Sequence, residues 1–109
     1  MQMFELEGNQ LKINFEMYND VKELSSLCHD LLESEYETIE IYFSDVVFMI
    51  GSCHVGILLM TAVVADRKKK QLVISCNGRL ARTFTMLGGH KLNIHVRETD
   101  VGGISEVVG

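Results

Sequence analysis

The chain has 109 residues, 47% of them hydrophobic and 23% charged, with a formal net charge of −5 at pH 7. This length and composition predict one globular domain and exclude a disordered chain. The three cysteines are an odd number at unrelated spacings, so we expect reduced thiols in a cytoplasmic protein. No run of about 18 apolar residues is present, and Glu5 and Glu7 come too early for a signal peptide, so we expect no membrane insertion.

The charges are distributed unevenly along the chain. Residues 1–45 carry eleven acidic and two basic side chains, whereas residues 46–109 carry four acidic and eight basic ones. The basic side chains concentrate at residues 67–70, with Arg79 and Arg82 following, but no aromatic residues are interleaved with them. We therefore expect no nucleic-acid binding and interpret the lysine run as the solvated end of a helix.

The first part of the chain predicts a β-hairpin, a helix and a further strand. Residues 4–7 alternate between apolar and acidic, a Gly-Asn turn follows, and residues 11–17 alternate strictly between apolar and polar. Polar residues that can cap a helix precede residues 21–32, in which apolar side chains recur at helical spacing. Residues 38–43 are β-branched and aromatic, which is typical of a strand.

A second predicted helix is apolar almost all round. Residues 46–50 form an apolar connector that leads to a tight turn, and residues 55–65 are nearly uniformly apolar. A helix that packs on a sheet needs only one apolar stripe, so part of this helix lies under another element or faces a partner. We assign Met60 to the core, with a place on a binding surface as the alternative.

The remaining elements complete an α/β sandwich. Residues 71–76 predict a buried strand, Asn77 caps a helix that ends at Gly88-Gly89, and residues 92–96 form a last strand. Strands that alternate with helices after an N-terminal hairpin imply a mixed β-sheet with helices packed on it. We assign residues 1–96 to one domain and residues 97–109 to a tail that is frayed or carries a short helix.

The turn before the apolar helix is the candidate site. It consists of Gly51, Ser52 and Cys53, where a strand ends and a helix begins. A serine hydroxyl can cap the free backbone N–H groups of the first helical turn, and the positive end of the helix dipole favours an anion such as phosphate. Ser52 is therefore the first candidate for function.

The order of these motifs resembles the STAS family, which includes the bacterial anti-sigma-factor antagonists. Segment 52–56 stands in place of the family's Ser-Ser-Gly-Leu-Gly, and segment 71–75 is similar to its next strand. Segments 77–88 and 91–94 resemble the family's following helix and closing strand. The match covers roughly residues 3–96, and it implies the same STAS-like α/β sandwich.

The resemblance implies a regulatory binding module. The unmodified protein would bind an anti-sigma factor that is also a serine kinase, phosphorylation of Ser52 would weaken the complex, and a PP2C-type phosphatase would restore it. The implied contact surface consists of Ser44, Asp45, Gly51, Cys53, His54 and Val55. Gly51 replaces the aspartate that usually precedes the phosphorylated serine, and the preceding loop is one residue longer. Two registers result, with Ser52 or Gly51 at the phosphoacceptor position, and the spacing to the strand at Leu72 favours Ser52.

A second function of a different class is a constitutive subunit that needs no phosphorylation. Some STAS-like proteins dock on the ATPase of a lipid-transport ABC complex, and a scaffold of a signalling assembly is a further alternative. We expect no enzymatic activity, because no glycine-rich phosphate-binding loop is present. The four histidines are scattered, so we expect no metal and no cofactor. Cys53 beside His54 at a helix start leaves a reactive thiol as a minor alternative.

Overall fold

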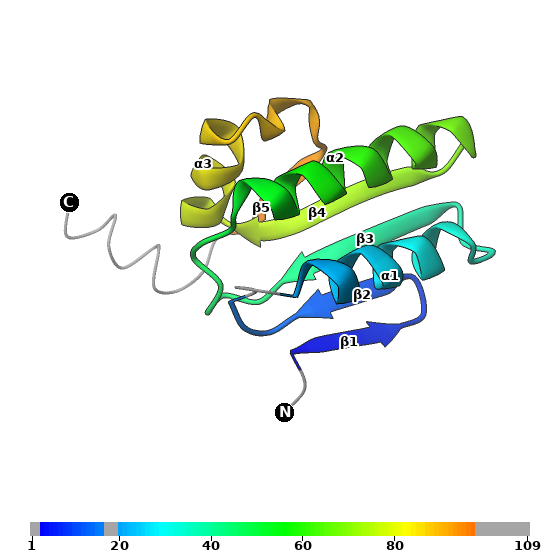
Figure 1. Cartoon of the computed structure of the whole chain (residues 1–109), viewed down its shortest axis with the longest axis horizontal. Coiled ribbons are helices and arrows are strands. Elements are labelled where there is room, and N and C mark those ends of the chain that lie inside the picture. The colour runs from blue at the N-terminus through cyan, green and yellow to red at the C-terminus, as the bar shows by residue number, and fades with distance from the viewer. Residues whose placement is uncertain (1–2, 17–19, 98–109) are drawn as a thin grey trace.

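The computed structural model describes residues 3–16 and 20–97 (Figure 1). In it, five strands form one mixed sheet in the order β1-β2-β3-β4-β5. The strands are β1 (Phe4–Glu7), β2 (Gln10–Ile13), β3 (Thr38–Phe43), β4 (Gln71–Asn77) and β5 (Ile94–Arg97). β1 and β2 form an antiparallel hairpin, and β2 to β5 are all parallel. The α/β fold with an N-terminal hairpin and a mixed sheet, predicted from the periodicity, is thus confirmed.

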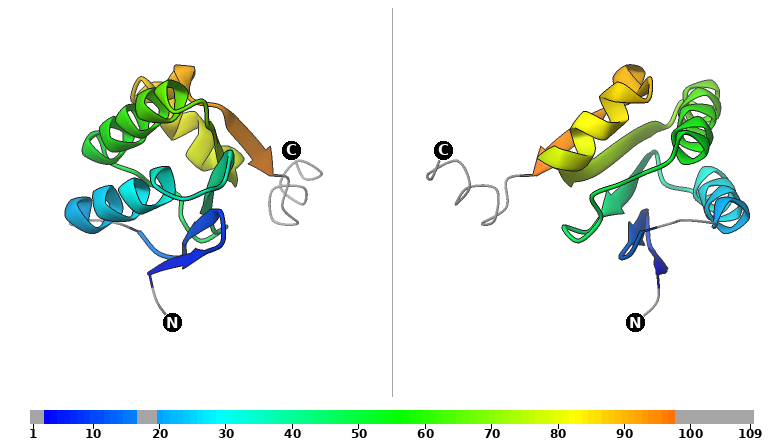
Figure 2. Two further views of the ribbon diagram at one scale, coloured as in Figure 1. Left: turned by 90° about the vertical axis from the view of Figure 1, so that its right-hand side faces the viewer. Right: turned by 60° about the vertical axis from the view of Figure 1, so that its left-hand side comes forward.

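The helices are α1 (Val21–Leu32), α2 (Ser52–Arg67) and α3 (Gly78–Met86), followed by the short 3-10 helix η1 (Gly89–Lys91). α1 and α2 lie side by side on one face of the sheet (Figure 2). α3 covers the same face, because the ring of its Phe84 packs edge-on against Phe43 of β3, with 5.6 Å between ring centroids. This arrangement follows from right-handed crossovers between neighbouring parallel strands, which all place their helices on one side.

Alternate side chains of the strands build the core beneath the helices. The fully buried members from β2, β3 and β4 are Leu11, Ile13, Ile39, Ile41, Phe43, Ile74 and Cys76. The opposite face of the sheet is polar: Gln10 donates a hydrogen bond to Glu40, and the ammonium of Lys12 lies over the ring of Tyr42. The strict alternation of apolar and polar residues in the sequence therefore corresponds to one buried and one exposed face of the sheet.

The second strand is shorter than predicted and ends at Ile13. Glu16 has left the sheet, because its carboxylate accepts the backbone N–H groups of Phe48 and Met49 at 3.0 and 3.3 Å. Glu16 thus supports the loop after β3, whereas the backbone N–H of Asn14 still donates to the Met3 carbonyl across the hairpin at 2.8 Å. Met17, the last residue of the predicted strand, lies outside the described residues.

The second predicted helix is longer than expected, and its core assignment is partly wrong. α2 runs from Ser52 to Arg67, and Met60 is 65% exposed, so Met60 does not belong to the core. In the described part of the chain, no helix combines the length and apolar character needed to cross a bilayer. The predicted tail beyond Arg97 lies outside the described residues, whereas Arg97 itself belongs to β5.

Candidate functional site

The candidate site lies where β3 ends and α2 begins. Here we call residues 44–55 the β3–α2 corner. It stands at the carboxyl end of β3, which is a parallel strand in the middle of the sheet. The functional role that the sequence suggested for Ser52 stays a prediction.

Buried contacts fix the backbone of the corner from below. Val47 is fully buried and Ile50 is nearly so, so both side chains anchor the loop in the core. The side-chain amide of Asn77 donates to the Val47 carbonyl at 3.0 Å, while its oxygen accepts the N–H of Leu80 at 2.8 Å and so caps α3. The predicted cap of α3 is confirmed, and it also joins α3 to the corner.

Arg97 holds the other side of the corner. Its guanidinium donates to the Phe43 carbonyl, to the Ser75 hydroxyl at 2.6 Å and to Asp45 at 3.1 Å. The same group lies 4.0 Å from the centroid of the Tyr42 ring. This arginine, which the sequence placed in the tail, therefore connects three strand ends with the loop.

Ser52 is exposed and is the first residue of α2. The cap position belongs to Gly51, which has no side chain to offer, and its carbonyl accepts the N–H of Val55 at 3.1 Å. The expectation that Ser52 itself caps the helix is therefore wrong. Its hydroxyl makes no hydrogen bond to any described residue and lies at the positive end of a 16-residue helix, accessible to a second molecule.

The other predicted contact residues divide into exposed and buried ones. Asp45, Gly51 and Cys53 are exposed, and Ser44 is half-buried, with its hydroxyl 3.4 Å from the carbonyl of Asn14. His54 and Val55 are buried, so they support the corner from within. The contact surface as predicted is therefore corrected: neither of these two side chains is accessible to a partner.

His54 is 5% exposed, and neither of its ring nitrogens has a hydrogen-bond partner among the described residues. Burial lowers the pKa of His54, because the charged imidazolium loses its hydration, and the carboxylate of Asp20 offsets part of this effect. A Cβ atom on Gly51 would lie only 3.2 Å from His54 Nδ1. The imidazole therefore occupies the space into which a side chain at position 51 would extend.

The three thiols differ in accessibility. Cys53 is exposed on the first turn of α2, whereas Cys28 and Cys76 are buried. Burial raises the pKa of each of the two buried thiols to about 11. No cluster of metal-ligating side chains is formed by the residues that the structure describes.

The loop before Ser52 carries exposed apolar side chains that the sequence analysis did not assign to the site. Val46, Phe48 and Met49 are 57%, 40% and 64% exposed, and the Arg79 guanidinium lies over the Phe48 ring at 5.1 Å. We call these three residues the apolar loop patch. The sequence could have indicated this patch, because the side chains of five consecutive apolar residues, 46–50, cannot all point into one core.

Comparisons with known proteins add no identification. No protein-family model matches the chain, and no curated protein is significantly similar to it. The fold and the corner define an α/β protein with a surface-exposed serine at a strand-to-helix junction. The resemblance to the STAS family therefore stays a prediction from the order of the sequence motifs.

Proposed function

We propose that this chain is a cytoplasmic regulatory binding module, similar to the anti-sigma-factor antagonists of the STAS family. Its partner would be an anti-sigma factor with serine kinase activity, and phosphorylation of Ser52 would control the complex. The observation that carries this proposal is the exposed Ser52 hydroxyl beside the apolar loop patch. Clustered exposed apolar side chains of this kind mark protein-interaction sites.

A phosphate on Ser52 would act through charge and desolvation. It adds about −1.5 to −2 charges at neutral pH, and the free N–H groups of the first turn of α2 would stabilise it in the unbound protein. In the complex the same charge would be buried against the apolar loop patch, on the corner that already carries the Asp45 carboxylate. Phosphorylation would therefore weaken binding without changing the fold.

The test is phosphorylation by the cognate kinase with ATP, followed by mass spectrometry and a binding assay. We expect one phosphate on the wild type, none on Ser52→Ala, and one on the control Ser26→Ala, which removes an exposed hydroxyl on α1. We also expect the phosphorylated protein to lose affinity for the kinase. An unmodified wild type, or equal modification of Ser52→Ala, would refute the proposed role of Ser52.

One observation favours a constitutive subunit as the second candidate. The place of the usual aspartate is occupied by Gly51, and the His54 ring fills the space beside it. In a lipid-transport complex the same apolar loop patch would dock on an ATPase, with no need for a kinase to recognise Ser52. An ATPase that co-purifies with wild type and Ser52→Ala, but not with Met49→Asp, would support this candidate and replace the first.

A further inference from the structure

The basic and acidic side chains are separated in space as well as along the chain. Residues 46–97 carry eight basic side chains and one acidic one, Asp66, whereas residues 1–45 carry two basic and eleven acidic ones. Figure 1 shows α2, β4, α3 and β5 on one side of the molecule and β1, β2, α1 and β3 on the other. The protein thus has a cationic and an anionic side, and this separation orients it in the field of a charged surface.

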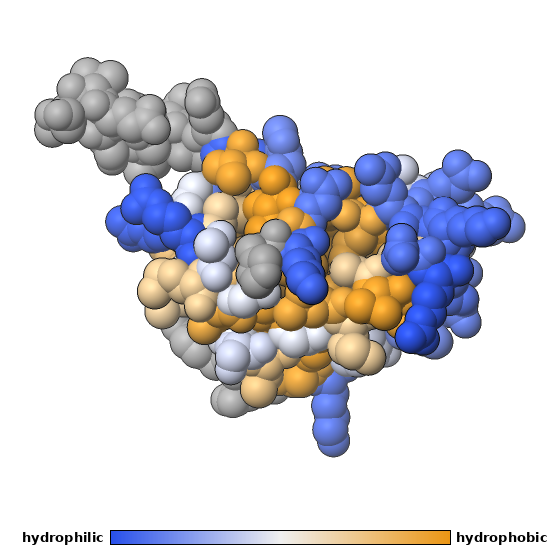
Figure 3. Space-filling view, turned by 90° about the horizontal axis from the view of Figure 1, so that it is seen from above, coloured by the Kyte–Doolittle hydropathy of each residue, from blue (hydrophilic) through white to orange (hydrophobic). Residues whose placement is uncertain are grey.

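The outward side of α2 lies on the cationic side of the molecule and is largely apolar. Leu58 is buried in the core, whereas Met60 and Val63 are 65% and 47% exposed. Met60, Val63 and Arg67 recur at spacings of three and four residues, so they lie along one side of α2, away from the core. Figure 3 shows a broad apolar band on the side of the molecule that carries α2 and α3, with hydrophilic side chains at its borders.

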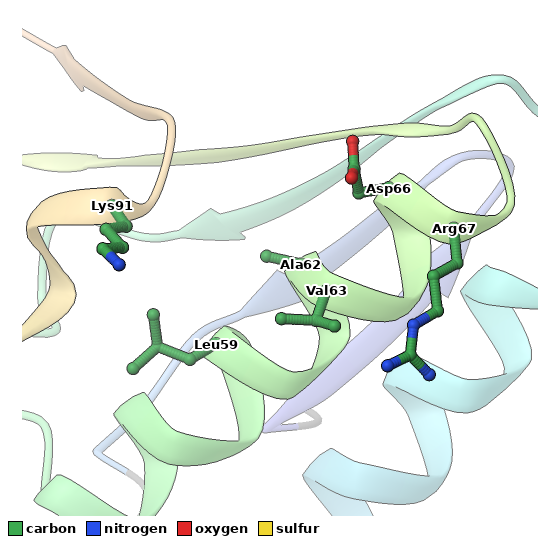
Figure 4. A pocket seen from close by; sticks show the side chains of 6 residues that line it. All are labelled: Leu59, Ala62, Val63, Asp66, Arg67 and Lys91. Atoms are coloured by element: carbon green, nitrogen blue, oxygen red, sulfur yellow. The ribbon is translucent and has the colours of Figure 1, made fainter.

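A groove between α2 and η1 adjoins these side chains. It has a volume of about 320 Å³, and its lining residues are Leu59, Ala62, Val63, Asp66, Arg67 and Lys91. The three apolar side chains form the floor, and Figure 4 shows the Lys91 side chain extending from η1 toward it. Two cations and one anion surround the floor, so the border of the groove has a net positive charge.

The cations of this region have no partner within the described part of the molecule. Arg67, Lys69 and Lys91 are exposed, and neither of the two ion pairs found there includes them. Their charges are therefore free to meet an external anion, and their long apolar stems can lie along the neighbouring apolar side chains. We call Met60, Val63, Arg67, Lys69 and Lys91 the basic apolar surface.

We propose that the basic apolar surface binds peripherally to a membrane that contains anionic phospholipids. Met60 and Val63 enter the boundary between headgroups and acyl chains, with α2 parallel to the membrane plane. The three cations lie at the level of the headgroups and attract the lipid phosphates. The acidic side of the molecule faces away from the membrane, so the separation of charge fixes the orientation of the bound protein.

A lipid surface fits these side chains better than a folded acidic protein does. Met60 and Val63 protrude from the convex side of a helix, and the cations beside them are not held in place by ion pairs with described residues. Lipids rearrange around protruding side chains, whereas a folded partner would need a recess of matching shape. The adjoining groove, with its apolar floor and positive border, suits the acyl chain and the phosphate of one lipid.

The proposal does not rest on the proposed function. Ser52 lies in the first turn of α2, about two turns before Met60. The kinase experiment and the membrane experiment therefore fail or succeed independently.

Co-sedimentation of the whole chain with vesicles tests the proposal. One set of vesicles contains phosphatidylcholine alone, and in the other about 30% of the lipid is phosphatidylglycerol. At about 0.05 M salt we expect binding to the anionic vesicles to be stronger than to the neutral ones by about tenfold or more. At about 0.5 M salt this difference should largely disappear, because salt screens exposed charges.

Charge variants distinguish a defined surface from a general effect of net charge. Arg67→Glu and Lys91→Glu should each weaken binding to the anionic vesicles by about tenfold or more, because each reversal changes the charge at the membrane by two. Asp66→Lys should strengthen binding by about the same factor, a gain that damage to the fold cannot produce. The control Lys22→Glu makes the same charge reversal on α1, on the acidic side of the molecule, and should bind like the wild type.

Met60→Ser tests the apolar contribution and should weaken binding by about threefold or more, with an unchanged circular dichroism spectrum. Equal binding of the wild type to both kinds of vesicle, or to neither, would overturn the proposal. Binding of Arg67→Glu and Lys91→Glu as strong as that of the wild type would also overturn it. Retention on immobilised polyglutamate without binding to anionic vesicles would assign the surface to an acidic polypeptide instead of a lipid.

Discussion

Replacing His54 by leucine should stabilise the folded protein and reduce its loss of stability in mild acid. Both ring nitrogens of His54 are buried without hydrogen-bond partners among the described residues. Each buried unsatisfied polar group costs about 1 to 3 kcal/mol, and leucine removes both nitrogens at the cost of some ring packing. We therefore expect His54→Leu to raise the free energy of unfolding by about 1 kcal/mol at pH 7.5.

The pH dependence follows from the lowered pKa of His54 in the folded state. As the pH falls through the ordinary histidine pKa of about 6.5, the unfolded chain binds a proton that the folded protein does not yet bind. The free energy of unfolding therefore falls with decreasing pH, and this loss stops only below the folded-state pKa. Between pH 7.5 and 5.5 the largest loss that one such histidine can cause is about 1.4 kcal/mol.

Urea unfolding at both pH values, followed by circular dichroism, measures this effect. The difference between pH 7.5 and pH 5.5 should be smaller in His54→Leu than in the wild type by up to about 1.4 kcal/mol. His29→Gln, on the exposed face of α1, is the control and should keep the wild-type difference. An unchanged difference in His54→Leu, or a clear loss of stability at both pH values, would refute the reasoning.

Three further predictions concern the same region. Asn77→Ala should lower the free energy of unfolding by about 1 to 3 kcal/mol, because it removes both the cap of α3 and the hydrogen bond to the Val47 carbonyl. The free energy of unfolding of Asn77→Asp, measured in urea, should lie between those of Asn77→Ala and the wild type. A thiol reagent at pH 8 should modify one cysteine rapidly in the folded protein and three in urea, and Cys53→Ser should remove the rapid phase. At pH 7.5, Gly51→Asp should raise the free energy of unfolding more in a His54→Ala background than in the wild type. The difference between the two backgrounds should be about 0.5 kcal/mol or more in a double-mutant cycle. If the two substitutions were additive, the His54 ring would not crowd a side chain at position 51.

The strands could be predicted well because their burial repeats every two residues. The predicted strand at residues 38–43 coincides with β3, and the hairpin, the order of elements and the cap at Asn77 are all found. The second strand was predicted too long because residues 15 and 16 keep the alternating pattern after the hairpin pairing has ended at Asn14. The Glu16 carboxylate accepts hydrogen bonds from backbone N–H groups more than thirty residues away in the sequence, and no local sequence pattern can indicate such contacts.

α2 could be predicted as a helix, but its orientation could not. A helix that is apolar nearly all round contains no information on which side meets the sheet. The crossovers between the strands decide it, and they leave Met60 and Val63 on the outside. The apolar pattern indicated that part of this helix lies under another element or faces a partner, and Met60 and Val63 are its exposed large apolar side chains in the described part of the chain.

The prediction that His54 lies on the contact surface is wrong for a similar reason. Its position in the first turn next to an exposed serine and an exposed cysteine is typical of a solvent-facing residue, but the ring turns back under Gly51. In the STAS-like motif that the corner resembles, aspartate stands at position 51 and glycine at position 54. Here the two positions carry glycine and histidine, so the larger side chain stands at the end of the turn. The absence of a side chain at 51 and the burial of the imidazole at 54 are therefore one structural feature. The His54 ring fills the space beside Gly51, and Ser52 is exposed at the start of α2.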